Sequence, residues 1–231
     1  IYGIITEPLL ENSEFKHGYL DTEKQNLGEM IKGRVNDKFE YAVERCLEEM
    51  CSGEPFSIYE YGLLENLDKI DSGMLYSQYV KMLREYPLQV YITGDVDSNQ
   101  TEYAIKKLKE LKRGNIKKLK EPSIEHRDIT EVKNVNEPME VYQGKLSLGF
   151  RTNTAANSQD RFALLVYNGI LGGGTHSKLF QNVREKASLA YYVFSRMEKF
   201  KGLMVISSGI EAGNRQKAER IILEQLDEVK K

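Results

Sequence analysis

Two residues in the second half of the chain have side chains suited to holding a peptide. Arg184 and Tyr191 stand seven positions apart, Arg184 near the end of a predicted helix and Tyr191 in the strand that follows it. A guanidinium and a phenol can both donate hydrogen bonds to a carbonyl oxygen, or to an oxyanion that forms from it. The same pair also fits a structural role, in which a helix-end arginine packs on a strand tyrosine. Residue types alone leave both interpretations open.

The helix that carries Arg184 is opened by the glycine triplet Gly172–Gly174. Thr175 or Ser177 is the predicted N-cap, because a hydroxyl oxygen can accept a hydrogen bond from the free N–H groups of a first turn. The helix is predicted to end near Lys186, where alternating residues begin a strand. A phosphate site at the glycines is the weakest interpretation, since no Gly-Lys-Ser or Gly-Lys-Thr follows them.

The stretch Leu171–Arg196 resembles the C-terminal-domain signature of the M16 zinc metallopeptidases, the pitrilysin/insulinase and mitochondrial-processing-peptidase-like family. That signature is a glycine pair followed by S-[RK]-L-F-x-x-[LV]-R-E-K-x-x-L-[AG]-Y-x-x-x-S. The matching residues, in order, are Gly172, Gly173, Ser177, Lys178, Leu179, Phe180, Arg184, Glu185, Lys186, Leu189, Ala190, Tyr191 and Ser195. In the family, the arginine and tyrosine reach across a closed chamber to the substrate at the zinc. The resemblance therefore implies substrate binding by Arg184, Tyr191, Gly172, Gly173 and Gly174.

The same resemblance makes a zinc site doubtful in this chain. Active members carry H-x-x-E-H, which is absent here, and a later helix reading E-K-Q-V-V-L-E-E-I, whose last glutamate is the third ligand. The matching segment Glu23–Ile31 reads EKQNLGEMI and places Met30 at the ligand position. Neighbouring Glu29 is rotated by about 100° around a helix, and a thioether suits a water-activating zinc poorly. We expect no metal or other cofactor in this chain, with zinc possible in the full-length protein or a partner.

The remaining candidate ligands are scattered. His17, His126 and His176 are expected to be solvent-exposed rather than to bind metal. Cys46 and Cys51 lack C-x-x-C spacing, and Cys46 lies on an apolar helical stripe, so free thiols are expected. Free thiols fit a reducing, cytoplasmic setting.

Composition excludes some partners. The 231 residues are 40% hydrophobic and 29% charged, with a formal net charge of -2, so no basic field attracts nucleic acid. No apolar run approaches the roughly 18 residues of a membrane span. The basic residues at the start of segment 113–138 lack interleaved aromatics and fit a solvated face. We expect neither nucleic-acid nor membrane binding.

Hydrophobic periodicity predicts an α+β fold, with a mainly antiparallel sheet and helices packed on one face. Helices are predicted over 13–33 and 37–51, from Ser72 onward, after Asp97, over 158–171 and at the C-terminus. In the helix over 158–171, the side chains of Phe162, Leu165, Val166 and Ile170 are predicted to face the core. Strands are predicted over 88–93, 140–151, 189–197 and 202–209, the last two as an antiparallel hairpin.

The resemblance implies a partial two-domain, LuxS/MPP-like arrangement. We expect the C-terminal part of a first M16-like domain over 1–112, a linker over 113–138 and the N-terminal part of a second domain over 139–231. The chain thus resembles the middle of a longer protein.

The resulting hypothesis is a noncatalytic M16 member that binds peptide and supports a zinc-bearing partner, as a homo- or heterodimer with another M16 subunit. One alternative is an active zinc endopeptidase whose H-x-x-E-H lies upstream, with Glu29 brought to the metal. The other is a structural scaffold subunit, for which Arg184 and Tyr191 have no evident use.

Overall fold

The computed structural model describes residues 2–119 and 129–230, and the chain forms two compact units. Their bounds are Ile1–Lys32 with Tyr61–Glu121 for the first, and Gly33–Glu60 with Pro122–Lys231 for the second. The units interleave in sequence because the helix within 33–60 packs on strands of the C-terminal half.

The predicted domains 1–112 and 139–231 divide the chain differently from these units and remain a prediction. Residues 120–128 of the predicted linker 113–138 lie outside the described residues.

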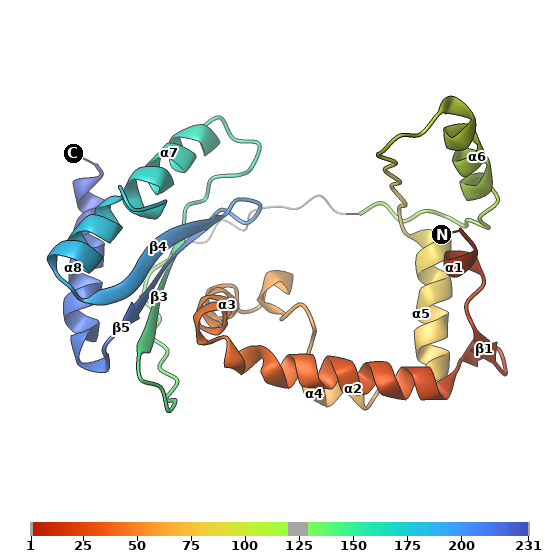
Figure 1. Ribbon diagram of the computed structural model, residues 1–231, viewed down its shortest axis with the longest axis horizontal. Coiled ribbons are helices and arrows are strands. Elements are labelled where there is room, and N and C mark those ends of the chain that lie inside the picture. The colour runs from red at the N-terminus through yellow and green to blue at the C-terminus, as the bar shows by residue number, and fades with distance from the viewer. Residues whose placement is uncertain (1, 120–128, 231) are drawn as a thin grey trace. The chain divides into compact units, whose positions relative to one another are not determined.

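The first unit is mainly helical (Figure 1). Its elements are α1 (Tyr2–Thr6), β1 (Leu10–Glu11), β2 (Glu14–Phe15), α2 (His17–Gly33), α4 (Leu64–Leu67), α5 (Ser72–Glu85) and α6 (Ser98–Lys109). Asp71, rather than Ser72, caps α5, because its carboxylate accepts from the Met74 N–H at 2.7 Å. Asp97 and Gln100 form a capping box at α6.

The predicted strand 88–93 is wrong, since these residues form no strand in the structure. A strand needs a neighbour to pair with, and the described strands of this unit, β1 and β2, pair with each other. The segment after α6 donates hydrogen bonds to backbone carbonyls in the last turn of α5. The Gly114 N–H donates to the Arg84 carbonyl at 2.8 Å, and the Arg113 side chain donates to the Leu83 carbonyl.

The second unit is built on a three-stranded antiparallel sheet in the order β3-β5-β4. The strands are β3 (Gly144–Arg151), β4 (Ala190–Glu198) and β5 (Leu203–Ile210). The predicted hairpin is confirmed, because β4 and β5 are antiparallel neighbours. The central strand β5 is buried along its whole length, which requires cover on both faces of the sheet.

One face of this sheet holds the main core beneath α7 (Arg161–Gly172), the π-helix η3 (Phe180–Lys186) and α8 (Arg215–Glu228). The core residues are Leu171, Leu179, Val183, Leu189, Val193, Met204, Ile206, Ile210, Ala218 and Ile222. The 3-10 helix η4 (Ala212–Asn214) leads from β5 into α8. This face confirms the predicted antiparallel α+β fold.

The opposite face of the sheet is covered by α3 (Lys38–Met50), an addition to the predicted one-sided arrangement (Figure 1). Phe39 packs its ring against Tyr192 and Phe194 of β4, with ring centroids 4.9 and 5.1 Å apart. Gly149 of β3 faces Met50, and a Cβ there would lie 1.9 Å from the Met50 sulfur. The predicted apolar face of this helix is thus confirmed as its packing face.

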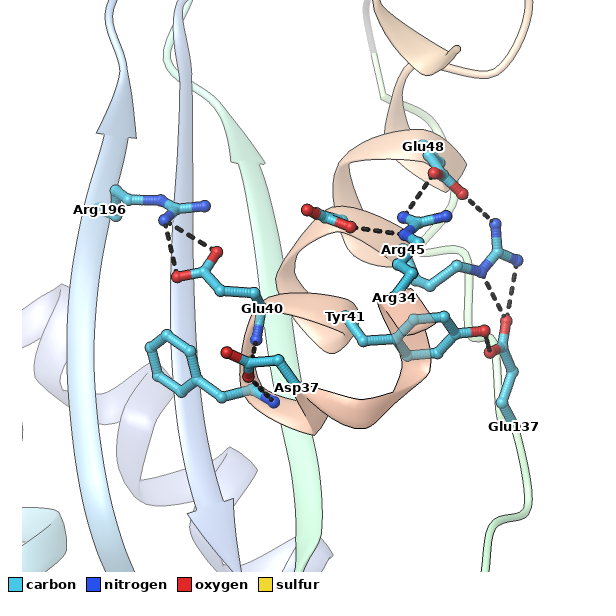
Figure 2. Close-up of polar contacts among 10 residues, drawn as sticks. Arg34, Asp37, Glu40, Tyr41, Arg45, Glu48, Glu137 and Arg196 are labelled. Carbon is cyan, nitrogen blue, oxygen red and sulfur yellow. Dashed lines mark hydrogen bonds and ion pairs between the residues drawn. The ribbon is translucent and has the colours of Figure 1, made fainter. Parts of the chain in front are cut away.

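Polar contacts fix both ends of α3. Asp37 caps its start by accepting from the Phe39 N–H at 3.0 Å, and Glu40 pairs with Arg196 of β4 at 3.3 Å (Figure 2). After the helix, before the 3-10 helix η2 (Pro55–Ser57), Glu54 forms an ion pair with Arg151 of β3. Because both side chains of this second pair are about 4% exposed or less, it is a buried pair.

A further charged network joins α3 to the segment that precedes β3. Arg45 pairs with Glu48, Glu49 and Glu137, and Tyr41 donates to Glu137 at 2.9 Å (Figure 2). Hydrogen bonds from Arg45 and Tyr41 hold the pKa of the Glu137 carboxyl below its usual value, against the opposing effect of burial. Arg34, in the 3-10 helix η1 (Arg34–Asn36), extends the network.

The inward face predicted for α7 is wrong. Phe162, Leu165, Val166 and Ile170 are 45–63% exposed, and Leu171 is the buried apolar residue of the helix. The helix is apolar around most of its circumference, so its sequence pattern does not single out the stripe that meets the sheet.

Removing the buried partner of Arg151 should destabilise the second unit strongly. Glu54→Ala leaves a buried guanidinium without its carboxylate, which costs about 3–5 kcal/mol. Glu40→Ala removes the exposed pair with Arg196 and should cost less than about 1 kcal/mol. Urea unfolding of both variants checks the ranking, and equal losses would contradict it.

The Glu137 network should make the free energy of unfolding depend on pH. A carboxyl whose folded pKa lies below its unfolded value of about 4.5 stabilises the protein above that pH, and this contribution disappears as pH falls through the folded pKa. Glu137→Gln should therefore lower the urea midpoint at pH 7 and lose this effect near pH 3. Exposed Glu140→Gln is the control, and a difference for Glu137→Gln that persists unchanged in acid would overturn the prediction.

Candidate functional site

The helix that carries Arg184 begins as predicted but changes type. Ser177 is its cap, since the buried hydroxyl oxygen accepts from the Phe180 N–H at 3.3 Å. After a short α-helical start, the chain winds as the π-helix η3, with an i→i+5 bond from the Ala187 N–H to the Asn182 carbonyl at 3.2 Å. π-helices are rare and often occur at functional sites.

A tight corner turns η3 into β4. Ser188 adopts a φ of 51°, the left-handed region that typically ends helices. The Ser188 N–H donates to the Arg184 carbonyl at 3.1 Å, and the Leu189 N–H donates to the Val183 carbonyl at 3.1 Å. These bonds occupy carbonyls at the helix end and fix where the strand with Tyr191 starts.

Arg184 is held by a ring rather than by an acid. Its guanidinium carbon lies 4.6 Å from the centroid of the Phe180 ring, and its side chain is 42% exposed. Among the described residues, the carboxylate within ion-pair distance is that of Glu185, at 3.8 Å, too long for a hydrogen bond. The N–H groups of Arg184 therefore remain open to a ligand.

Tyr191 is the extra residue of a β-bulge. Its neighbours Ala190 and Tyr192 pair with Ile210 and Gly209 of β5, which are consecutive, so no residue of β5 stands opposite Tyr191. A bulge re-aims a side chain and is common beside active sites. The ring is 54% exposed. Arg184 and Tyr191 thus lie at either side of one corner, each on a local irregularity.

The glycines of the triplet differ in environment. Gly172 is buried at the end of α7, and a Cβ there would lie 2.5 Å from the Ser195 backbone nitrogen and 2.9 Å from Leu179 Cδ1. Gly173 is exposed, and Gly174 is half-buried beside His176. Packing alone accounts for Gly172, while substrate contact at the triplet remains a prediction.

The side chains near Met30 do not fit a zinc ion. Met30 is 48% exposed on the unbroken helix α2, and Glu29 pairs with Lys32 at 3.1 Å. Within residues 2–119 and 129–230, no three His, Cys, Asp or Glu side chains gather closely enough to hold a metal ion. The donor set that zinc hydrolysis needs, three N, O or S ligands around an open position, is not offered by these residues.

The other candidate ligands were three histidines and two cysteines. His17 and His176 are exposed, as expected, and His126 lies outside the described residues. Cys46 and Cys51 are not joined in a disulfide, as expected. Burial raises the pKa of the Cys46 thiol to about 11, so it stays protonated and unreactive at neutral pH.

Comparison with known proteins assigns the family. A model described as the Peptidase M16 inactive domain matches residues 69–231, which is more than half of the chain. The chain therefore belongs to the M16 peptidase family. It is similar to the "Probable inactive metalloprotease YmfF" of Bacillus subtilis, 39% identical over 98% of this chain and 53% of that protein. It is also similar to the B. subtilis "Uncharacterized zinc protease YmxG", 35% identical over 40% of this chain and 23% of that protein.

Solved structures show the same fold. A conserved protein from Enterococcus faecalis V583 has a TM-score of 0.87 and 31% identity over 98% of this chain and 53% of that chain. An M16 inactive domain from Pseudomonas fluorescens has a TM-score of 0.68 and 17% identity over 93% of this chain and 52% of that chain. The chain thus spans about half the length of YmfF and of these structures.

Sequence reasoning left Phe180 without a role, although the structure places its ring against Arg184. The signal was present, because an aromatic and an arginine four residues apart on a helix lie on the same face.

Gly172 should tolerate no side chain. In Gly172→Ala the new methyl meets strand backbone that cannot move aside, which should destabilise the second unit by about 1–3 kcal/mol. Gly169→Ala, in the same helix with nothing within 4 Å of its Cβ, should be neutral or stabilise by up to about 1 kcal/mol. Thermal unfolding compares them, and equal behaviour of the two variants would contradict the close contact.

Proposed function

We propose that this chain is part of a catalytically inactive M16 protein that binds peptide at the Arg184–Tyr191 corner and presents it to a zinc-bearing M16 partner. The observation that carries the proposal is the exposure of both side chains on irregular elements, with the hydrogen-bond donors of Arg184 uncommitted among the described residues. A π-helix and a β-bulge are less favourable than regular elements. Because one of them occurs at each of these two residues, a functional role for both side chains is favoured.

Two observations support the lack of catalysis. The position that matches the third zinc ligand holds Met30, whose thioether suits a water-activating zinc poorly, and the similar B. subtilis protein bears the name "Probable inactive metalloprotease YmfF". The alternative of an active enzyme requires Glu29 to reach a metal. Because α2 runs without a break from His17 to Gly33, Glu29 stays on a different side of the helix from position 30.

The corner suits recognition of backbone rather than of one side chain. A guanidinium and a phenol donate hydrogen bonds to carbonyl oxygens, which every peptide carries. Gly173 is exposed and Gly174 half-buried, and without side chains they would let an extended backbone approach closely. The ligand class is therefore an unfolded or extended peptide.

We place the protein in the cytoplasm, as a dimer with a second M16 subunit. Cys46 and Cys51 are not joined in a disulfide, which suits a reducing cytoplasm. No helix in residues 2–119 or 129–230 is both long and apolar enough to cross a membrane. A dimer with a second M16 subunit supplies the zinc that these residues do not hold.

Peptide affinity tests the proposal. In the full-length protein, Arg184→Ala should weaken binding of short, random-sequence, fluorescein-labelled peptides by about 10- to 100-fold, as expected for loss of a charged hydrogen bond. Tyr191→Phe should weaken it by about 2- to 10-fold through loss of a neutral one. Fluorescence anisotropy measures both.

Matched controls are available on the same unit. Arg220, on α8, is exposed and lies 3.8 Å from a Glu224 carboxylate oxygen, the same separation as between Arg184 and Glu185. Tyr142 is fully exposed. Arg220→Ala and Tyr142→Phe should bind peptide like the unchanged protein. Equal affinities across all four variants would refute peptide binding at the corner and favour a scaffold role.

A further inference from the structure

Phe180 and Arg184 form a stacked pair at the start and middle of η3. The guanidinium carbon lies 4.6 Å from the ring centroid, within the range of a cation–π contact. Their i, i+4 spacing puts both on one side of the helix, so the local winding holds the contact in place. Phe180 is half-buried, which anchors its ring against the unit.

We propose that Phe180 is the positioning residue of the peptide site, holding the Arg184 guanidinium so that its N–H groups face the ligand. This inference rests on the proposed function. The Phe180 ring carries no oxygen or nitrogen acceptor, so a guanidinium held over it keeps its N–H donors free for a ligand. A carboxylate in the same place would occupy those donors.

Phe180 would raise peptide affinity by restricting the Arg184 side chain before the peptide binds. A free arginine side chain carries about 2 kcal/mol of rotamer entropy, which is lost when it binds a ligand. Stacking on Phe180 removes part of that freedom before the peptide arrives. Among the described residues the alternative restraint is Glu185, whose contact of 3.8 Å is too long to be a hydrogen bond. The ring is therefore the main restraint on Arg184.

Substitution of the ring tests this role in the full-length protein, with the same labelled random-sequence peptides. Phe180→Leu keeps apolar bulk and removes the π face, and should weaken binding by about 2- to 5-fold, the equivalent of an exposed cation–π contact. Phe180→Tyr keeps the π face and should bind like the unchanged protein. Phe162→Ala, which removes another arginine-stacked phenylalanine, at 4.4 Å from Arg161, is the control and should have no effect.

A double-mutant cycle separates positioning from general structural damage. Phe180→Leu should have no further effect in an Arg184→Ala background, because the ring acts through the guanidinium. An effect of Phe180→Leu that is equally large without Arg184, or the absence of any effect beside intact Arg184, would overturn the positioning role.

The proposed function can fail separately. If Arg184→Ala itself binds peptide normally, peptide recognition by the corner is wrong, and the positioning role falls with it. If Arg184→Ala loses affinity while Phe180→Leu keeps it, only the positioning role is wrong.

Discussion

The close approach of α7 to strand β4 at Gly172 is the contact on which the candidate site depends. Without a Cβ, Gly172 lets the backbone of Ser195 and the side chain of Leu179 pack against the end of the helix. One small residue therefore sets the spacing of α7, the start of the Arg184 helix and β4 together. The corner between Arg184 and Tyr191 joins these last two packed elements, and the backbone hydrogen bonds of Ser188 and Leu189 set its local geometry.

The sheet beneath the corner is stabilised from both sides. Its central strand β5 is buried throughout, with the main core on one face and α3 on the other. Gly149 has on that second face the role that Gly172 has on the first, since it allows a helix to approach without obstruction. A rigid base of this kind lets the rim carry less favourable local structure, here the π-helix and the bulge, where the side chains of Arg184 and Tyr191 are exposed.

Much of the fold was predictable because its signals are local. The apolar stripe of α3, the β4–β5 hairpin and a hydroxyl cap at Thr175 or Ser177 follow from spacing and residue type, and the structure selects Ser177 as the cap. Strand 88–93 was mispredicted because pairing depends on a neighbour that its own sequence does not specify. The packed side of α7 was mispredicted because nearly every side of it is apolar. Arg184 and Tyr191 could be singled out by type and motif, whereas the winding of η3 and the bulge depend on tertiary packing.

The proposed function places peptide binding on this chain and zinc on a second subunit, so the two subunits would divide the work of one peptidase. The most direct test measures zinc content and peptide hydrolysis of the full-length protein, alone and mixed with an M16 homologue that carries H-x-x-E-H. The account predicts no zinc and no turnover alone, and turnover on mixing that falls when this chain carries Arg184→Ala. Stoichiometric zinc with turnover by the protein alone would contradict it.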